Sequence, residues 1–141
     1  MKKIFFLSLT LALSVSLFAQ EKKNVEFSEG THDYGTVVQG AENGRIRTVF
    51  KFKNISASPI VITDARASCG CTTPNVEKNK LIAPGEYGEI PVTYDSNRVG
   101  SFNKQITVTF GIGSETFQEL LYIKGVVNAK PEAQPTAALV K

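Results

Sequence analysis

The most distinctive chemistry in this sequence comes from two cysteines that a single glycine separates, in the segment Ser68-Cys69-Gly70-Cys71-Thr72. They are the only cysteines among the 141 residues. Two sulfurs this close along the chain can form a disulfide, and the small ring that the bond closes is strained, which raises its reduction potential. On this interpretation Cys69 and Cys71 form an oxidant or a labile redox switch.

Two other interpretations of the cysteine pair stay open. Two thiolates on one turn suit Cu(I) or Zn²⁺, but further ligands must come from elsewhere. The supply is small, because His32 is the only histidine and Met1 the only methionine. The third interpretation is structural: Gly70 permits a left-handed turn, and both cysteines lie half-buried or bridged at the rim of the fold.

The other titratable residues do not form a catalytic set. His32 is followed by Asp33 and Tyr34, but no nucleophile pattern accompanies them, and a lone histidine in a loop favours a solvated or capping role. Glu86 and Glu89 lie near a turn, where carboxylates keep an edge strand soluble. The sequence contains no Gly-x-Ser-x-Gly, His-Glu-x-x-His, phosphate-binding glycine loop or dinucleotide motif. It therefore predicts a protein that is not an enzyme and needs no cofactor.

The elements that must position these residues are strands. From Val25 onward apolar residues recur at every second position, and glycine, proline, asparagine or aspartate interrupts the pattern about every ten residues. The predicted strands are 25–27, 34–38, 46–53, 60–65, 90–94, 102–110 and 121–126. The first two are short edge strands on either side of a link at 30–33. Pro84 and Gly85 suit a tight turn before the fifth strand.

One phase of this alternation must face a core. The predicted core residues are Phe50, Phe52, Ile60, Ile62, Ile90, Val92, Tyr94, Ile106 and Val108. Leu121, Ile123 and Val126 form the last inward row. About seven short strands cannot bury their apolar faces in one flat sheet, so two sheets must pack together. The predicted fold class is an all-β, antiparallel, immunoglobulin-like sandwich of seven to nine strands.

Both ends of the chain differ from this pattern. Residues 1–19 begin with Lys2 and Lys3, continue through an uncharged apolar run and reach a small residue at Ala19, as in a cleavable signal peptide. The domain is predicted at 20–127. Residues 128–141 contain two prolines and no periodicity, and they are predicted to be a flexible tail. The predicted location is the periplasm or the medium, because no cysteine near the cleavage point could carry a lipid.

The charge balance limits the partners. Loss of the two signal lysines lowers the formal net charge from +3 to +1, and a near-neutral domain is a poor match for nucleic acid or an anionic membrane surface. The apolar run near the start of the chain is too short to span a membrane, and no other run of this kind follows it. The expected mature protein is therefore a monomer without an integral membrane segment.

Several of these motifs, in order, resemble a bacterial family known as domain of unknown function 1573. The matching pieces are Phe50-Lys51-Phe52-Lys53-Asn54, Pro59-Ile60-Val61-Ile62, Ser68-Cys69-Gly70-Cys71-Thr72, Ile82-Ala83-Pro84-Gly85-Glu86 and Ile90-Pro91-Val92-Thr93-Tyr94-Asp95. Asp33-Tyr34-Gly35 and the segment 121–127 extend the match. The family is similar in turn to Hydin-type and major-sperm-protein-type immunoglobulin-like domains, which the resemblance implies are interaction modules. It marks Cys69, Gly70 and Cys71 as a family motif and supplies no activity.

The function predicted from these observations is an exported, non-catalytic binding or scaffold module of the cell envelope. Its partner is an unidentified protein or another envelope component. The alternative is a thiol-redox or soft-metal-handling protein that uses Cys69-Gly70-Cys71. The loops at the ends of the sandwich and the edge strands are the surfaces on which such a module would bind.

Overall fold

The computed structural model describes residues 22–132. In chain order its strands are β1 (Val25–Phe27), β2 (Thr31–Val38), β3 (Arg45–Asn54), β4 (Ile60–Ala67), β5 (Thr72–Pro74), β6 (Tyr87–Asp95), β7 (Gly100–Ile112) and β8 (Glu115–Asn128). A helical turn, α1 (Ala41–Gly44), precedes β3, and three of its residues have left-handed φ angles. The predicted signal peptide and residues 133–141 of the predicted tail lie outside the described residues. No helix within 22–132 is long and apolar enough to cross a membrane.

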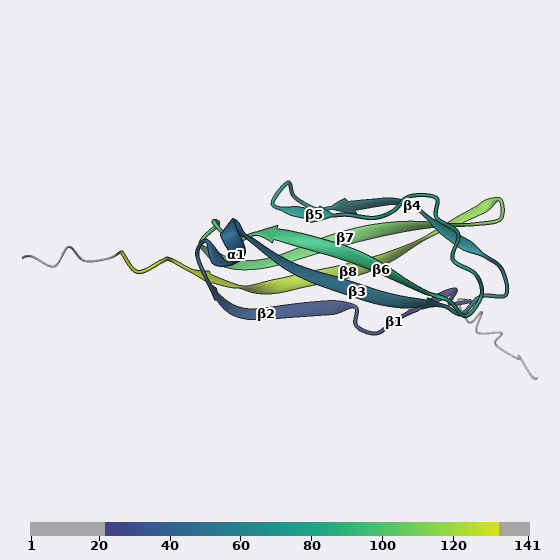
Figure 1. Ribbon diagram of the computed structural model, residues 1–141, viewed down its shortest axis with the longest axis horizontal. Helices are drawn as coiled ribbons and strands as arrows, with labels where there is room; N and C mark the ends of the chain where they lie inside the picture. Colours follow the sequence, from purple (N-terminus) through teal and green to yellow (C-terminus); the bar gives the residue numbers. More distant parts are fainter. Residues whose placement is uncertain (1–21, 133–141) are drawn as a thin grey trace, which may run out of the picture.

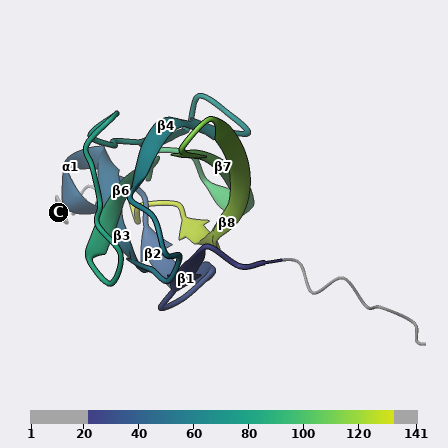
Figure 2. The same cartoon turned by 90° about the vertical axis from the view of Figure 1, so that its right-hand side faces the viewer.

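Two four-stranded sheets pack face to face (Figures 1 and 2). One has the order β1-β3-β6-β5 and the other β2-β8-β7-β4. This arrangement confirms the predicted immunoglobulin-like sandwich of seven to nine strands. It departs from a purely antiparallel sandwich in one pair, because β2 runs parallel to β8, with Thr31 opposite Tyr122 and Val38 opposite Asn128.

The first two strands belong to different sheets. β1 pairs with the end of β3, whereas β2 pairs with β8 in the opposite sheet. The prediction of a link at 30–33 was wrong, since Thr31–Asp33 are already part of β2. The physical reason is that polar side chains such as Asp33 are tolerated on the exposed face of an edge strand, so the sequence there has little apolar periodicity.

Side chains of both sheets meet in one core. The nine core residues named from the sequence are each at most 3% exposed. Four phenylalanine rings at one end pack in tilted, edge-on and stacked pairs, with ring centroids 5.1–6.4 Å apart. Val126 does not belong to the last inward row. Strict alternation along β8 from Leu121 and Ile123 brings Val127 inward and leaves Val126 39% exposed.

Candidate functional site

The cysteine segment is the point where the chain crosses from one sheet to the other. It leaves β4 at Ala67 and enters β5, in the opposite sheet, at Thr72. On the β7 side, the Ser68 N–H donates to the Gln105 carbonyl at 2.9 Å, and the Ser68 hydroxyl accepts from the Gln105 N–H at 3.2 Å. On the β6 side, the Asp95 N–H donates to the Cys71 carbonyl at 2.9 Å. The crossing is therefore fixed to both sheets by backbone groups.

A disulfide joins Cys69 to Cys71, with the two Cα atoms 5.3 Å apart. The two cysteines are unequally exposed: Cys71 is 5% exposed, whereas Cys69 is half-buried. The hydroxyl of Thr72, itself 4% exposed, lies 3.7 Å from the Cys69 sulfur and 3.8 Å from the Cys71 sulfur. The site thus joins a half-buried cysteine to a buried one, with a single hydroxyl near both sulfurs.

The structure bears on two of the interpretations of this segment. Gly70 lies in the turn, but its φ is not in the left-handed region, so the expected left-handed turn was wrong. A Cβ at this position would meet nothing within 4 Å. The metal interpretation lacks ligands among residues 22–132, because the bonded sulfurs are not thiolates and no group of three His, Cys, Asp or Glu side chains is present there.

His32 lies elsewhere, on edge strand β2. Its Nδ1 is 2.9 Å from a carboxylate oxygen of Glu29, and its ring packs edge-on against Tyr34, with centroids 4.7 Å apart. Both partners of the histidine are therefore local, since Tyr34 lies on β2 and Glu29 lies just before that strand.

A small polar depression of about 210 Å³ adjoins the disulfide. Its walls come from α1, the start of β3, the cysteine turn, β5 and the end of β6, and its lining residues are Asn43, Gly44, Arg45, Gly70, Cys71, Thr73, Thr93, Tyr94, Asp95 and Asn97. Asp95 is held by the Asn97 N–H at 3.0 Å. This hydrogen bond, followed by the contacts with the Asn97 side chain and Arg98, keeps the pKa of Asp95 below its ordinary value.

Aromatic rings lie behind the depression. Tyr94 stacks on Phe102, with ring centroids 3.9 Å apart. Tyr34 also packs against Phe102, with ring centroids 6.0 Å apart. The Tyr34 hydroxyl is buried and has no hydrogen-bond partner among the described residues. Burial raises the pKa of Tyr34 strongly, and the nearby charge of Glu42 raises it further.

The opposite end of the sandwich contains Pro84 and Gly85. They occupy the centre of a turn that the Glu86 N–H closes on the Ala83 carbonyl at 3.0 Å, and Gly85 has a φ of 82°. The carboxylate of Glu86 accepts from the Ala83 N–H at 2.9 Å. Glu86 therefore holds the turn with its side chain as well as its backbone.

Asn54 organises this end, and the sequence analysis did not single it out. It is fully buried. Its Nδ2 donates to the carbonyls of Ser58 and Ile82, both at 2.9 Å, and its Oδ1 accepts from the N–H and hydroxyl of Ser56 at 3.0 and 2.7 Å. One asparagine before a turn-like Ser-Ala-Ser-Pro sequence was the only signal.

A groove of about 640 Å³ opens between β4 and β6. Its lining residues are Ile62, Asn75, Val76, Glu77, Lys80, Ile82, Tyr87, Gly88, Glu89 and Pro91. Tyr87 in its lining is 73% exposed. Leu81, which is 70% exposed, lines a different hollow of about 670 Å³ beside the turn between β7 and β8. In this groove the exposed ring of Tyr87 lies beside the buried side chains of Ile62 and Ile82.

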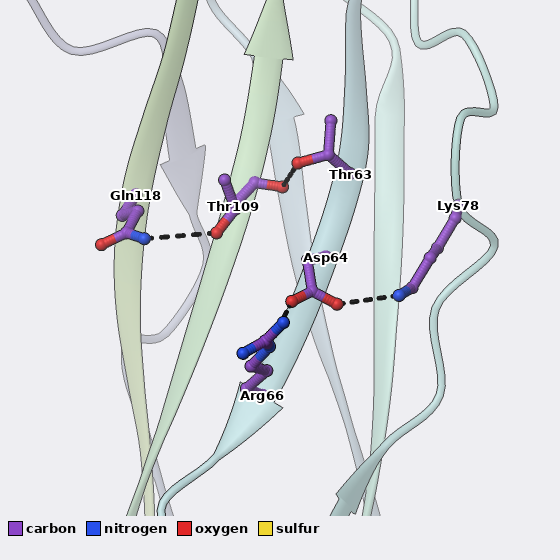
Figure 3. A network of polar contacts seen from close by, with 6 residues as sticks. All are labelled: Thr63, Asp64, Arg66, Lys78, Thr109 and Gln118. Atoms are coloured by element: carbon purple, nitrogen blue, oxygen red, sulfur yellow. Dashed lines mark hydrogen bonds and ion pairs between the residues drawn. The ribbon is translucent and has the colours of Figure 1, made fainter.

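A polar network crosses β8, β7 and β4 and reaches the loop that carries Lys78 (Figure 3). Asp64 accepts from Lys78 at 2.8 Å and from Arg66, and these two hydrogen bonds, that of Lys78 first, lower the pKa of Asp64 to about 2. Beside it, a β-bulge lets the Thr63 hydroxyl donate to the Thr109 carbonyl at 3.1 Å. The same loop covers part of the outer edge of β4, because the Asn79 N–H donates to the Ile62 carbonyl at 2.9 Å and the backbones of Ile60 and Ile82 exchange hydrogen bonds.

Solved structures share this fold at low sequence identity. VesB protease of Vibrio cholerae superposes with a TM-score of 0.61 at 13% identity, over 73% of this chain and 32% of that one, so the chain spans about a third of VesB. The ASH/PapD-like domain 7 of human CEP192 matches with a TM-score of 0.62 at 8% identity, over 76% and 87% of the two chains. WR4, an MSP family member of C. elegans, gives a TM-score of 0.52 at 8% identity, over 74% and 98%.

These likenesses support the fold alone. They agree with the expected similarity to immunoglobulin-like domains of the major-sperm-protein type. None of the curated proteins with which the chain was compared matches it. The family model described as "Protein of unknown function (DUF1573)" matches residues 25–127, and the chain belongs to that family.

Proposed function

We propose that this protein is exported and acts as a non-catalytic binding module of the cell envelope, which takes up an extended segment of a partner along the free edge of β6. The immunoglobulin-like fold is consistent with an interaction domain, and the first nineteen residues have the layout of a signal peptide. The fold likeness to a protease carries no activity to this chain, since it covers a third of that protein at 13% identity.

The observation that carries the proposal is the unpaired half of β6. Strand β5 covers β6 only from Val92 to Tyr94, and the Asn75 N–H reaches the Pro91 carbonyl at 2.8 Å. Because backbone groups alternate in direction along a strand, the N–H and C=O of Glu89 point to the same side as the Pro91 carbonyl. No strand of the described residues pairs with that side before Pro91.

The groove supplies a floor for the side chains of an added strand. Ile62, Val76 and Ile82 line it beneath the free edge. A peptide that pairs with Glu89 would direct alternate side chains towards this apolar floor and the others to solvent. The partner favoured by this chemistry is an extended segment with apolar side chains at every second position.

A proline at residue 89 tests the edge. Pro91 already occupies the same phase of β6, so Glu89→Pro removes one outward N–H without removing a hydrogen bond to β3. Glu89→Ala is the matched control, because it removes the charge and keeps the N–H. Each variant, expressed as residues 20–141, is used as bait in envelope extract after circular dichroism and melting temperature confirm the fold.

We expect proteins captured by the wild type and by Glu89→Ala to be lost with Glu89→Pro. A p-benzoylphenylalanine at position 87 should cross-link to the same proteins. Equal capture by all three baits would exclude the β6 edge as the binding site. Export is tested separately by N-terminal sequencing of protein from the periplasmic fraction, where we expect the chain to begin at Gln20.

A further inference from the structure

We propose that the Cys69–Cys71 disulfide is a thiol–disulfide exchange site for a dithiol, in which the Cys69 sulfur is attacked and Cys71 leaves as a thiolate that the Thr72 hydroxyl stabilises. This inference does not depend on the proposed binding edge of β6. That edge lies before Pro91, whereas the cysteine turn contacts the other end of β6, at Asp95. It rests on the unequal burial of the two cysteines, on the position of Thr72 and on the size of the ring.

Accessibility selects the sulfur that an incoming thiolate reaches. Cys69 is half-buried at the surface of the turn, whereas Cys71 is 5% exposed. The residue between them, Gly70, is exposed and carries no side chain. Exchange rates depend on access to the attacked sulfur, so a thiol approaching this end of the sandwich meets Cys69 first.

Thr72 is placed to hold the leaving group. Its hydroxyl is close to both sulfurs and, among the described residues, has no other hydrogen-bond partner. A thiolate at the buried Cys71 would be costly without a donor, because burial in apolar surroundings raises a thiol pKa. A hydroxyl that donates to the sulfur lowers this cost and makes Cys71 a better leaving group.

The surroundings allow the bond to open without loss of the crossing. The crossing is also held by the hydrogen bond of the Ser68 N–H to the Gln105 carbonyl and that of the Asp95 N–H to the Cys71 carbonyl, and neither involves a sulfur. A disulfide that closes such a small ring also adds less stability than one that closes a long loop. The reduced protein is therefore expected to keep the sandwich.

The exchange balances in two steps. A thiolate of the dithiol attacks the Cys69 sulfur, a mixed disulfide forms, and the electron pair of the broken bond stays on Cys71, which then takes up a proton. The second thiol of the dithiol loses its proton and attacks the dithiol-derived sulfur of the mixed disulfide. This breaks the bond to Cys69, which leaves as a thiolate and takes up a proton. The dithiol is oxidised to a disulfide, and Cys69 and Cys71 are reduced to two thiols.

The first experiment uses the unmodified mature protein. Residues 20–141 are equilibrated in buffers with graded ratios of reduced to oxidised glutathione, then alkylated and weighed by mass spectrometry. Since structural disulfides resist the glutathione pool, we expect oxidised and reduced forms to coexist within the accessible ratios, with the same far-ultraviolet circular dichroism spectrum. A protein that stays fully oxidised throughout would overturn the proposal and leave the bond a structural brace.

The second experiment tests the roles of the three residues. Reduction by dithiothreitol is timed for Thr72→Val and for Thr73→Val, the exposed neighbour, as a control. We expect Thr72→Val to slow the reaction by about threefold to tenfold, the effect of losing one hydrogen bond, and Thr73→Val to leave the rate unchanged. Equal rates would remove Thr72 from the mechanism.

The attacked sulfur is identified with single variants and oxidised glutathione. Cys71→Ser leaves the thiol of Cys69, which should form a mixed disulfide quickly, whereas Cys69→Ser leaves the buried thiol of Cys71, which should react slowly. The reverse order would overturn the assignment of Cys69. The glutathione equilibrium of the wild type decides the proposal even where a variant fails to fold.

Discussion

The two ends of the sandwich close in different ways. At the end that contains Asn54 and the turn of Pro84 and Gly85, one buried side chain satisfies four polar groups through hydrogen bonds of 2.7–3.0 Å. At the cysteine end, the crossing between sheets is closed by a covalent bond, a polar depression lies beside it, and a buried tyrosine hydroxyl has no partner among the described residues.

The difference separates a structural region from an adaptable one. A fully satisfied buried network fixes one geometry, because every alternative leaves a polar group without a partner. A region with an unmatched hydroxyl and a half-buried disulfide has less to lose when it rearranges. Chemistry or binding that needs local movement is therefore expected at the cysteine end, and stability is expected to come from the Asn54 end.

Removal of the asparagine network should have the largest effect. Asn54→Ala leaves the Ser56 N–H without its partner and removes one of the hydrogen bonds of the Ser56 hydroxyl and of the Ser58 and Ile82 carbonyls. A buried unsatisfied donor costs about 1–3 kcal/mol, and each lost hydrogen bond adds about 0.5–1.5 kcal/mol. We expect the free energy of unfolding in urea to fall by about 2–4 kcal/mol. Asn103→Ala, at an exposed position, should change it by less than about 0.5 kcal/mol. A loss no larger than that of the control would refute the comparison.

The turn glycines of the two ends should respond differently to alanine. Gly85 has a φ of 82°, so Gly85→Ala should cost about 1–2 kcal/mol. Gly70 does not use the left-handed region and has open space around its Cβ direction. Gly70→Ala is expected to be neutral or to stabilise by up to about 1 kcal/mol, through the lower entropy of the unfolded chain. Chemical denaturation of both variants checks the pair, and equal losses would contradict it.

Removal of the Tyr34 hydroxyl should raise the stability of the protein. Tyr34→Phe removes a buried donor that has no partner among the described residues, and we expect stability to rise by about 1 kcal/mol. The pKa of Tyr34 is raised in the folded state. The protonated hydroxyl therefore contributes fully to the free energy of unfolding below pH 10.0, the ordinary pKa of tyrosine, and this contribution is lost as the pH rises above that value. Unfolding measured between pH 8 and about 11 should show a smaller alkaline loss in the variant. A destabilised variant would reveal a partner for this hydroxyl.

The smallest effect is expected between the two ends, at Asp64. Its folded pKa of about 2 lies below the ordinary 3.8, so its ion pairs stabilise the fold above pH 3.8, and this contribution is lost as the pH falls towards 2. Asp64→Asn should be slightly less stable than the wild type at pH 7, and the difference should vanish near pH 2. Glu115→Gln, whose carboxylate has no ion pair with any described residue, is the control. A constant difference over this range would show that the pairs contribute nothing.

The core residues could be predicted from the sequence, but the pairing of the strands could not. Alternation showed which side of each segment is apolar, so Phe50, Ile90 and Val108 could be identified as inward-facing. The alternation contained no information on strand pairing, because the pattern of a strand indicates which face is buried and not which strand lies beside it. The parallel pairing of Thr31 with Tyr122 joins residues that are far apart in the chain, and no local pattern encodes it.

The sequence predicted only those features of the candidate site that depend on residues close together in the chain. The spacing of Cys69 and Cys71 made a bond between them one of three interpretations. The burial of Cys71 and the position of the Thr72 hydroxyl depend on β6 and β7, which pack around the turn from later in the chain. The role of Asn54 was missed for the same reason, since its partner Ile82 is 28 residues away.

The sheet change between β1 and β2 determines how the domain responds to tension. β1 begins at the Asn54 end, β8 finishes at the cysteine end, and β2 lies parallel to β8 (Figure 1). A pull that separates the residues before β1 from those after β8 draws the two parallel strands past each other lengthwise. Their hydrogen bonds then share the force in shear and do not open one after another. A domain connected in this way resists stretching between two attachments better than an arrangement that unzips.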